Sequence, residues 1–80
     1  MKKAEISPID QYVIDKVREI RKEKGISQRE LANLLDMSYG FIGDVESPKE
    51  PAKYNLAHIN LIAKIFKCSP RDFLPEIPIE

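Results

Sequence analysis

The sequence predicts a small all-α domain made of five short helices. Apolar residues recur at intervals of three or four along most of the chain, as they do on one face of a helix. A serine or asparagine suited to the N-cap position precedes each apolar run, and no segment competes as a strand. A chain of 80 residues makes one domain, so a single unit is expected over 1–80.

Serine-led segments mark the starts of the first two helices. The segment Ser-Pro-Ile-Asp at 7–10 has a serine N-cap, a proline at the first helical position and an acid three residues after the serine. Gly25 ends this helix after a basic last turn. The segment Ser-Gln-Arg-Glu at 27–30 is a full capping box, so a second helix begins at Gln28 and ends near Leu35.

The remaining helices flank a loop that contains two prolines. Ser38 is a suitable N-cap for a third helix from Tyr39 to about Ser47, and the loop "SPKEPAK" (47–53) follows. A fourth helix begins near Asn55 and is apolar around most of its circumference, which predicts a central, buried position. A second Ser-Pro-x-Asp start at 69–72 opens a short fifth helix.

Composition argues against a strongly basic nucleic-acid binder, a disulfide-stabilised protein and a membrane-spanning protein. With 13 basic and 13 acidic residues the net charge is zero, and the segment 28–47 carries one basic and four acidic residues, so any DNA contact depends on a few placed cations. Cys68 is the only cysteine, which fits a reducing compartment. The longest apolar stretch, 59–66, is too short to span a bilayer, and a cytoplasmic protein is expected.

Nothing in the sequence points to an enzyme or a cofactor. No metal-binding or nucleophile motif is present. His58 is the only histidine and has no cysteine or carboxylate at ligand spacing, so a plain surface residue is expected there.

Residues 28–47 form the most informative unit, because two short helices joined by a tight turn make a helix-turn-helix. Ala32 lies where the two helices approach most closely. Asp36 in the turn is expected to need a left-handed backbone, which Asp tolerates better than most residues. The apolar positions expected to share a small core are Leu31, Leu35, Met37, Ile42 and Val45.

The segments "VREIRKEKGISQRELANLLDMS" (17–38) and "LAHINLIAKIFKCSPRDFL" (56–74) resemble the Xre/Cro-like repressor family. The resemblance covers nearly the whole chain and implies the five-helix lambda-repressor-like fold. It also implies a transcriptional regulator, expected here to be a repressor, that binds operator DNA, usually as a dimer, with the helix 39–47 in the major groove. Arg21 and Glu46 match a structural ion pair of that family.

The expected DNA contacts combine positions implied by the resemblance with cations nearby. Gln28 would contact a phosphate, and the loop after the third helix would grip the DNA backbone. The full set is Gln28, Arg29, Ser38, Tyr39, Gly40, Gly43, Asp44, Ser47, Lys49, Lys53 and Asn55.

The glycines of the third helix leave two functional interpretations open. Gly40 and Gly43 each cost a helix interior about 1 kcal/mol relative to alanine. They could let the backbone lie close to the groove while Tyr39 and Asp44 read a few bases. Alternatively, this smooth acidic face meets protein, and the chain is an antitoxin-like or coregulator-like interaction module on the same fold.

The C-terminal segment is the expected surface for a homodimer. Prolines at 75 and 78 keep the tail 75–80 extended. Dimer contacts are expected through Phe73, Leu74, Ile77 and Ile79, with Ile65 and Phe66 as further candidates. The alternative is that these residues cover the core of the monomer, and the sequence favours neither.

Overall fold

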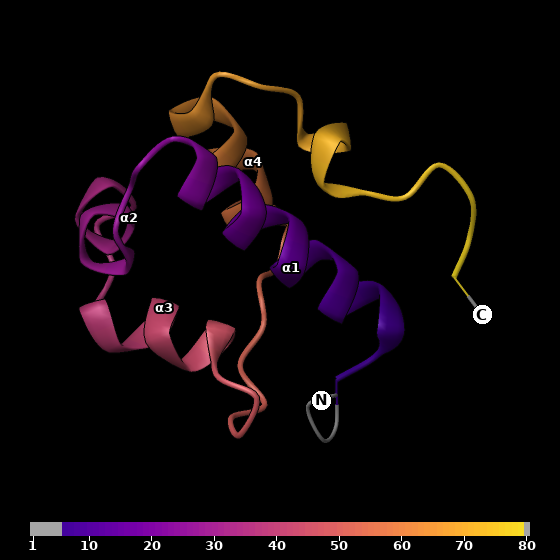
Figure 1. Ribbon diagram of the computed structural model, residues 1–80, viewed down its shortest axis with the longest axis horizontal. Coiled ribbons are helices and arrows are strands. Elements are labelled where there is room, and N and C mark those ends of the chain that lie inside the picture. The colour runs from indigo at the N-terminus through magenta and orange to yellow at the C-terminus, as the bar shows by residue number, and fades with distance from the viewer. Residues whose placement is uncertain (1–5, 80) are drawn as a thin grey trace.

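The computed structural model describes residues 6–79 and is all-α, as predicted (Figure 1). No strand occurs within 6–79, and residues 1–5 and 80, which the predicted domain and tail include, lie outside the described part. The fifth predicted helix is a single 3-10 turn, because Pro75 disfavours helical backbone at the preceding residue and leaves too few residues for an α-helix. The elements are α1 (Pro8–Glu23), α2 (Gln28–Leu34), α3 (Tyr39–Glu46), α4 (Leu56–Phe66) and the 3-10 helix η1 (Pro70–Phe73).

The first two predicted helix starts form the capping bonds that their sequences indicate, and the third does not. Ser7 Oγ accepts from the backbone N–H of Asp10 at 3.2 Å. Ser27 Oγ accepts from the backbone N–H of Glu30 at 3.0 Å, and the Glu30 carboxylate accepts from Ser27 N–H at 3.4 Å. Ser38 occupies the N-cap position of α3, but its hydroxyl accepts no capping hydrogen bond from the described residues.

His58 is not the plain surface residue that the sequence suggested. Its Nδ1 accepts from the backbone N–H of Asn55 at 3.0 Å, while Asn55 Oδ1 accepts from His58 N–H at 2.8 Å. Its half-buried ring also lies 5.2 Å from the Phe41 ring, between centroids, and 6.2 Å from that of Tyr54. His58 therefore caps α4 and ties its start to α3.

Three residues adopt left-handed backbone conformations where the chain must turn. Asp36, between α2 and α3, has φ 56°, which confirms the prediction for this position. Gly25 has φ 70° and separates α1 from α2. Lys67 has φ 58° at the end of α4, where glycine would be the usual residue, and this conformation was not predicted.

One apolar core joins all five elements. In Figure 1, α1 runs across the molecule, α2 and α3 lie together at one end, and η1 packs against α1 and α4. Ala32 is fully buried, as expected where helices meet closely. The buried apolar residues are Val13, Ile14, Val17, Leu31, Ala32, Leu35, Ile42, Val45, Tyr54, Ile59, Ile62, Ala63, Phe66 and Phe73.

Some apolar residues expected at the surface are buried, and one expected to be buried is exposed. Phe73 and Phe66 are buried inside the monomer, so their predicted roles as dimer contacts are wrong. Leu56 belongs to the helix predicted to be buried, but it is 83% exposed because it is the first residue of α4, beyond the packed turns. No helix within 6–79 is long and apolar enough to cross a membrane.

Candidate nucleic-acid interface

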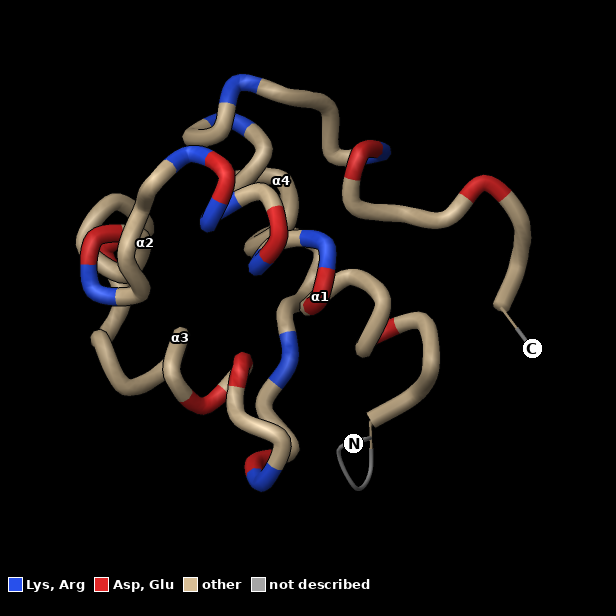
Figure 2. The backbone as a smooth tube through the Cα atoms, viewed as in Figure 1, with Lys and Arg blue, Asp and Glu red and all other residues tan. Residues whose placement is uncertain are grey.

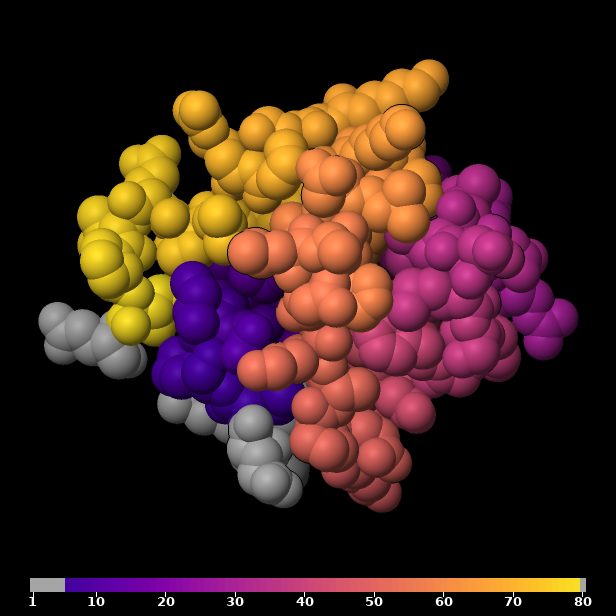
Figure 3. Space-filling model, turned by 180° about the vertical axis from the view of Figure 1, so that it is seen from behind, coloured from indigo at the N-terminus to yellow at the C-terminus, as the bar shows by residue number. Residues whose placement is uncertain are grey.

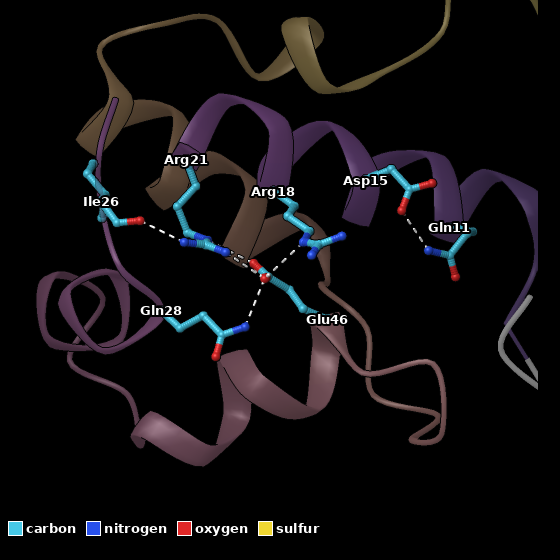
Figure 4. Close-up of polar contacts among 7 residues, drawn as sticks. All are labelled: Gln11, Asp15, Arg18, Arg21, Ile26, Gln28 and Glu46. Atoms are coloured by element: carbon cyan, nitrogen blue, oxygen red, sulfur yellow. Dashed lines mark hydrogen bonds and ion pairs between the residues drawn. The ribbon is translucent and has the colours of Figure 1, made fainter. Parts of the chain in front are cut away.

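A buried ion pair anchors the end of α3 to α1 (Figure 4). Arg21 Nε donates to Glu46 Oε2 at 3.0 Å, and Arg21 Nη2 donates to Glu46 Oε1 at 2.8 Å. The two side chains are only 8% and 3% exposed. Arg21 Nη1 also donates to the carbonyl of Ile26 at 2.7 Å, so the guanidinium holds α1, the α1–α2 connection and α3 together.

Glu46 also contacts two side chains, Gln28 and Arg18, whose contacts with it were not predicted from the sequence. Gln28 Nε2, from α2, donates to Glu46 Oε1 at 3.0 Å, and Arg18 Nε lies 3.7 Å from the same oxygen. The predicted contact of Gln28 with a phosphate stays a prediction. Because Nε2 already donates to Glu46, the phosphate would accept either from the backbone N–H of Gln28 or from Nε2 after its bond to Glu46 breaks. The spacing of Arg18 and Arg21 on one side of α1 was the available signal for the second arginine.

The outer side of α3 is open. Tyr39 is 53% exposed, and Gly40 and Asp44 are also exposed. A Cβ built on Gly40 would meet no described atom within 4 Å, and one on Gly43 would meet only Gln28 Oε1, at 3.8 Å. Packing within the described chain therefore does not require either glycine.

Arg29 and Tyr39 lie together at the leading end of α3. The Arg29 guanidinium carbon is 4.9 Å from the centre of the Tyr39 ring, a cation–π contact between α2 and α3. The contact holds a cation beside the first residue of α3. Both residues are among those predicted to contact DNA, and the structure brings them together.

The loop after α3 carries the other predicted cations. Lys49 is exposed, and its backbone N–H donates to Ser47 Oγ at 3.2 Å. Lys53 is also exposed, but its Nζ lies 3.3 Å from Asp10 Oδ2, so its charge is partly offset by α1. Asn55 is the N-cap of α4.

Charge is distributed unevenly over this surface. In Figure 2, α3 carries acidic positions and no basic one, whereas basic positions lie at the start of α2 and in the loop that follows α3. Phosphates are therefore expected to meet the edges of α3 rather than its centre.

The pKa values of two side chains, the buried Tyr54 and the partly buried Cys68, are shifted. Burial raises the pKa of the Tyr54 phenol well above its usual range and the Glu46 carboxylate adds to the shift, while Arg21 opposes it. The Tyr54 hydroxyl has no hydrogen-bond partner within 6–79. Burial also raises the pKa of the Cys68 thiol, with Asp72 adding to the effect. Neither group lies among the predicted DNA contacts.

The helix-turn-helix formed by α2 and α3 agrees with the protein family that the sequence matches. The family of Cro/C1-type HTH DNA-binding domains matches residues 16–78, which include α2, α3, α4 and η1. The chain belongs to this family. Its family is one of DNA-binding regulators rather than enzymes, and no three His, Cys, Asp or Glu side chains in the described part could hold a metal ion.

Two solved structures share the fold of this chain. The restriction-modification controller protein C.AhdI from Aeromonas hydrophila is 28% identical, with a TM-score of 0.68 over 79% of this chain and 92% of that one. A hypothetical transcription factor, NHTF from Neisseria, shares the fold at 22% identity, with a TM-score of 0.74 over 94% of this chain and 87% of that one. No curated protein sequence matches the chain.

Proposed function

We propose that this Cro/C1-type HTH protein is a sequence-specific repressor that binds operator DNA as a homodimer, with α3 in the major groove. The observation that carries the proposal is the open outer side of α3, where two glycines leave the helix backbone bare. Glycine in a helix is unfavourable by about 1 kcal/mol. Since packing within the described chain gives no reason for the glycines, close approach by a partner supplies one.

The hydrogen bonds that Arg21 and Gln28 donate to Glu46 support this role. A recognition helix must keep a fixed angle to the rest of the domain, because a small tilt moves its side chains out of register with the bases. The bidentate Arg21–Glu46 pair joins α3 to α1 through two hydrogen bonds, both of 3.0 Å or shorter. Gln28 adds a link to α2. α3 is thereby held from its inner side, and the contact of Arg29 with Tyr39 adds a further link to α2.

The readout proposed for this surface is sparse. Tyr39 offers a hydroxyl and an apolar ring edge to the groove, and Asp44 offers acceptors suited to a cytosine amino group. Arg29, stacked on Tyr39, is the cation nearest to the start of α3. Lys49 is the main candidate for a phosphate contact from the loop.

The acidic character of α3 favours a second candidate function, which is binding to another protein. A protein-interaction module on the same fold would use the same open helix face for a protein rather than a duplex. Zero net charge and the absence of Lys or Arg from α3 favour this alternative.

Selection of bound sites from random duplex DNA tests the proposal most directly. A palindromic consensus with half-sites about one helical turn apart is expected. Binding measured by fluorescence anisotropy should weaken as salt rises, with a slope set by the number of phosphate contacts. No enrichment and no binding at low salt would contradict the DNA-binding role and favour the interaction module.

Two lysine variants distinguish a direct phosphate contact of Lys49 from a general effect of the net charge of the protein. Lys49→Ala should weaken binding to all sites alike and lower the salt slope by about one. Lys64→Ala removes the same charge from the last turn of α4, which lies toward the opposite edge of the molecule from α3 in Figure 1, and should leave binding unchanged. Equal effects of the two variants would contradict the assignment of Lys49. Repression itself is tested with a reporter gene placed behind the selected site.

A further inference from the structure

We propose that Arg29 is the residue through which this protein reads a guanine of its operator, and that Tyr39 holds the Arg29 guanidinium in position. The inference rests on the proposed function and deepens it, because it names a base that each half-site contains and the side chain that recognises that base. Its failure would leave DNA binding itself untouched.

Side chains that can donate two parallel hydrogen bonds are scarce around α3. Arg29 is the only Lys or Arg between residues 28 and 47, and α3 itself contains neither. In the major groove guanine presents two acceptors, N7 and O6, and is recognised by paired N–H donors. The ionised Asp44 carboxylate only accepts hydrogen bonds, and Tyr39 donates from a single oxygen. Within 28–47, only Arg29 has side-chain donors on separate nitrogen atoms, spaced to match both acceptors.

The Arg29 guanidinium is held beside the start of α3. Arg29 is the second residue of α2, and Tyr39 is the first residue of α3. The guanidinium carbon lies over the Tyr39 ring, 4.9 Å from its centre. A cation–π contact engages the charge of the guanidinium and uses no hydrogen-bond acceptor, so the N–H groups stay available for a base.

No other group in the described chain competes for the Arg29 donors. Arg29 is exposed, and none of the ion pairs or side-chain hydrogen bonds within 6–79 includes its guanidinium. The arginines of α1 differ, because Arg21 donates to Glu46 and Arg18 lies 3.7 Å from the same carboxylate. Arg29 therefore combines a fixed position beside α3 with uncommitted donors.

The position of Tyr39 favours a base rather than a phosphate as the partner of Arg29. When a recognition helix lies in the major groove, its N-terminal residues contact base edges. Tyr39 is such a residue, is 53% exposed, and brings the guanidinium with it. A guanidinium already restrained on a ring also loses less conformational freedom when it meets a planar pair of acceptors.

The same contact predicts the base beside the guanine. Successive bases of one strand are about 3.4 Å apart along the duplex. The Arg29 guanidinium carbon and the Tyr39 ring centre are 4.9 Å apart, so the two groups reach neighbouring bases. The apolar edge of the Tyr39 ring suits the methyl group of thymine. Each half-site is therefore expected to contain a thymine next to the guanine.

Base analogues in the selected operator test this assignment atom by atom. Each invariant guanine of the consensus is replaced in turn by 7-deazaguanine, which lacks N7, or by inosine, which keeps N7 and O6. In anisotropy titrations of the full chain, one 7-deazaguanine position should weaken binding several-fold, whereas inosine there should not. Uracil in place of the neighbouring thymine, which removes only the methyl group, should also weaken binding.

Variants of Arg29 connect the guanine to this side chain. Arg29→Ala should lower affinity for the operator by roughly 5-fold to 150-fold and remove the penalty of 7-deazaguanine. Arg29→Lys keeps the charge without the fork of donors, so it should retain part of the affinity and lose the preference for guanine.

Variants of Tyr39 test the positioning role. Tyr39→Phe keeps the ring and should keep the penalty of 7-deazaguanine, whereas Tyr39→Ala should reduce that penalty. Arg71→Ala is the matched control, because it removes an exposed arginine from η1. In Figure 3 the C-terminal segment from η1 onward (yellow) lies on the opposite side of the molecule from α2 and α3 (magenta). This control should change neither the affinity nor the base preference.

Three results would overturn the assignment while leaving the proposed function standing. The first is a consensus without an invariant guanine. The second is an Arg29→Ala variant that binds all duplexes more weakly by the same factor, which would make Arg29 a phosphate contact. The third is a penalty of 7-deazaguanine that persists in Arg29→Ala, which would assign guanine to another group. A chain that binds no DNA at low salt would overturn the assignment together with the proposed function.

Discussion

Replacing Gly43 by alanine should have opposite effects on the stability of the protein and on its affinity for DNA. Gly43 is in the interior of α3, which has eight residues. An added Cβ would touch only Gln28 Oε1, at 3.8 Å, an ordinary contact distance. The free protein therefore gains the helix propensity of alanine without a clash.

The two magnitudes follow from the local structure. Alanine in place of a helical glycine stabilises by about 0.5–1 kcal/mol, which raises the melting temperature of a domain this small by roughly 2–8 °C. At a DNA surface packed as tightly as a protein interior, an inserted methyl group costs about 1–3 kcal/mol. Affinity for the operator should therefore fall by roughly 5-fold to 150-fold.

Thermal melting and anisotropy titration on the selected operator measure the two effects on the same samples. Gly40→Ala should behave similarly, because a Cβ at Gly40 meets no described atom within 4 Å. Gly25→Ala is the control of opposite sign. Gly25 has φ 70°, so alanine there should destabilise the fold by about 1 kcal/mol and leave the affinity of the folded protein unchanged.

Two results would refute this reasoning. If Gly43→Ala stabilised the protein and bound DNA as tightly as the wild type, the α3 backbone would not lie against the duplex. If it lowered the melting temperature, the open space beside α3 would be absent in solution.

Four further predictions concern stability and reactivity. Glu46→Ala should lower the free energy of unfolding by about 3–5 kcal/mol in urea titrations, since it leaves the buried Arg21 charge without its ion-pair partner, and Arg21→Ala should lower it by less, since Arg18 Nε still lies 3.7 Å from Glu46 Oε1. Lys67→Gly should raise it by about 1 kcal/mol, because the backbone there is left-handed. The raised pKa of Tyr54 means that the unfolded chain ionises first, so stability should fall as pH rises above about 10, and Tyr54→Phe should remove that fall. Cys68, whose pKa is raised by burial, should react with iodoacetamide more slowly at pH 8 than an unstructured cysteine peptide does.

The helices were predictable because their start and stop signals are local. Ser27 and Glu30 are three residues apart, and the capping box they form requires no other part of the chain. Asp36 was predictable for the same reason, since the tight turn alone demands its backbone conformation. The 3-10 geometry of η1 was missed because four residues between two prolines fit either kind of helix by pattern.

The site was only partly predictable because its contacts are distant in sequence. Arg21 and Glu46 are 25 residues apart, and only resemblance to a family paired them. The bonds from Gln28 to Glu46 and the stacking of Arg29 on Tyr39 depend on the angle between helices, which periodicity does not report. Phe73 was assigned to the dimer surface because an apolar residue near a chain end looks the same in sequence whether it faces inward or outward.

The position of Glu46 has a consequence for how such a protein can change its target. Ile42, Val45 and Glu46 are among the side chains that fix α3 in place, and all three point inward. Positions 40 and 43, where an added Cβ would clash with no described atom, can then accept a small side chain without loosening the scaffold. Single substitutions at these two positions would therefore alter the exposed side of α3 and leave the inward-facing side chains that hold it unchanged.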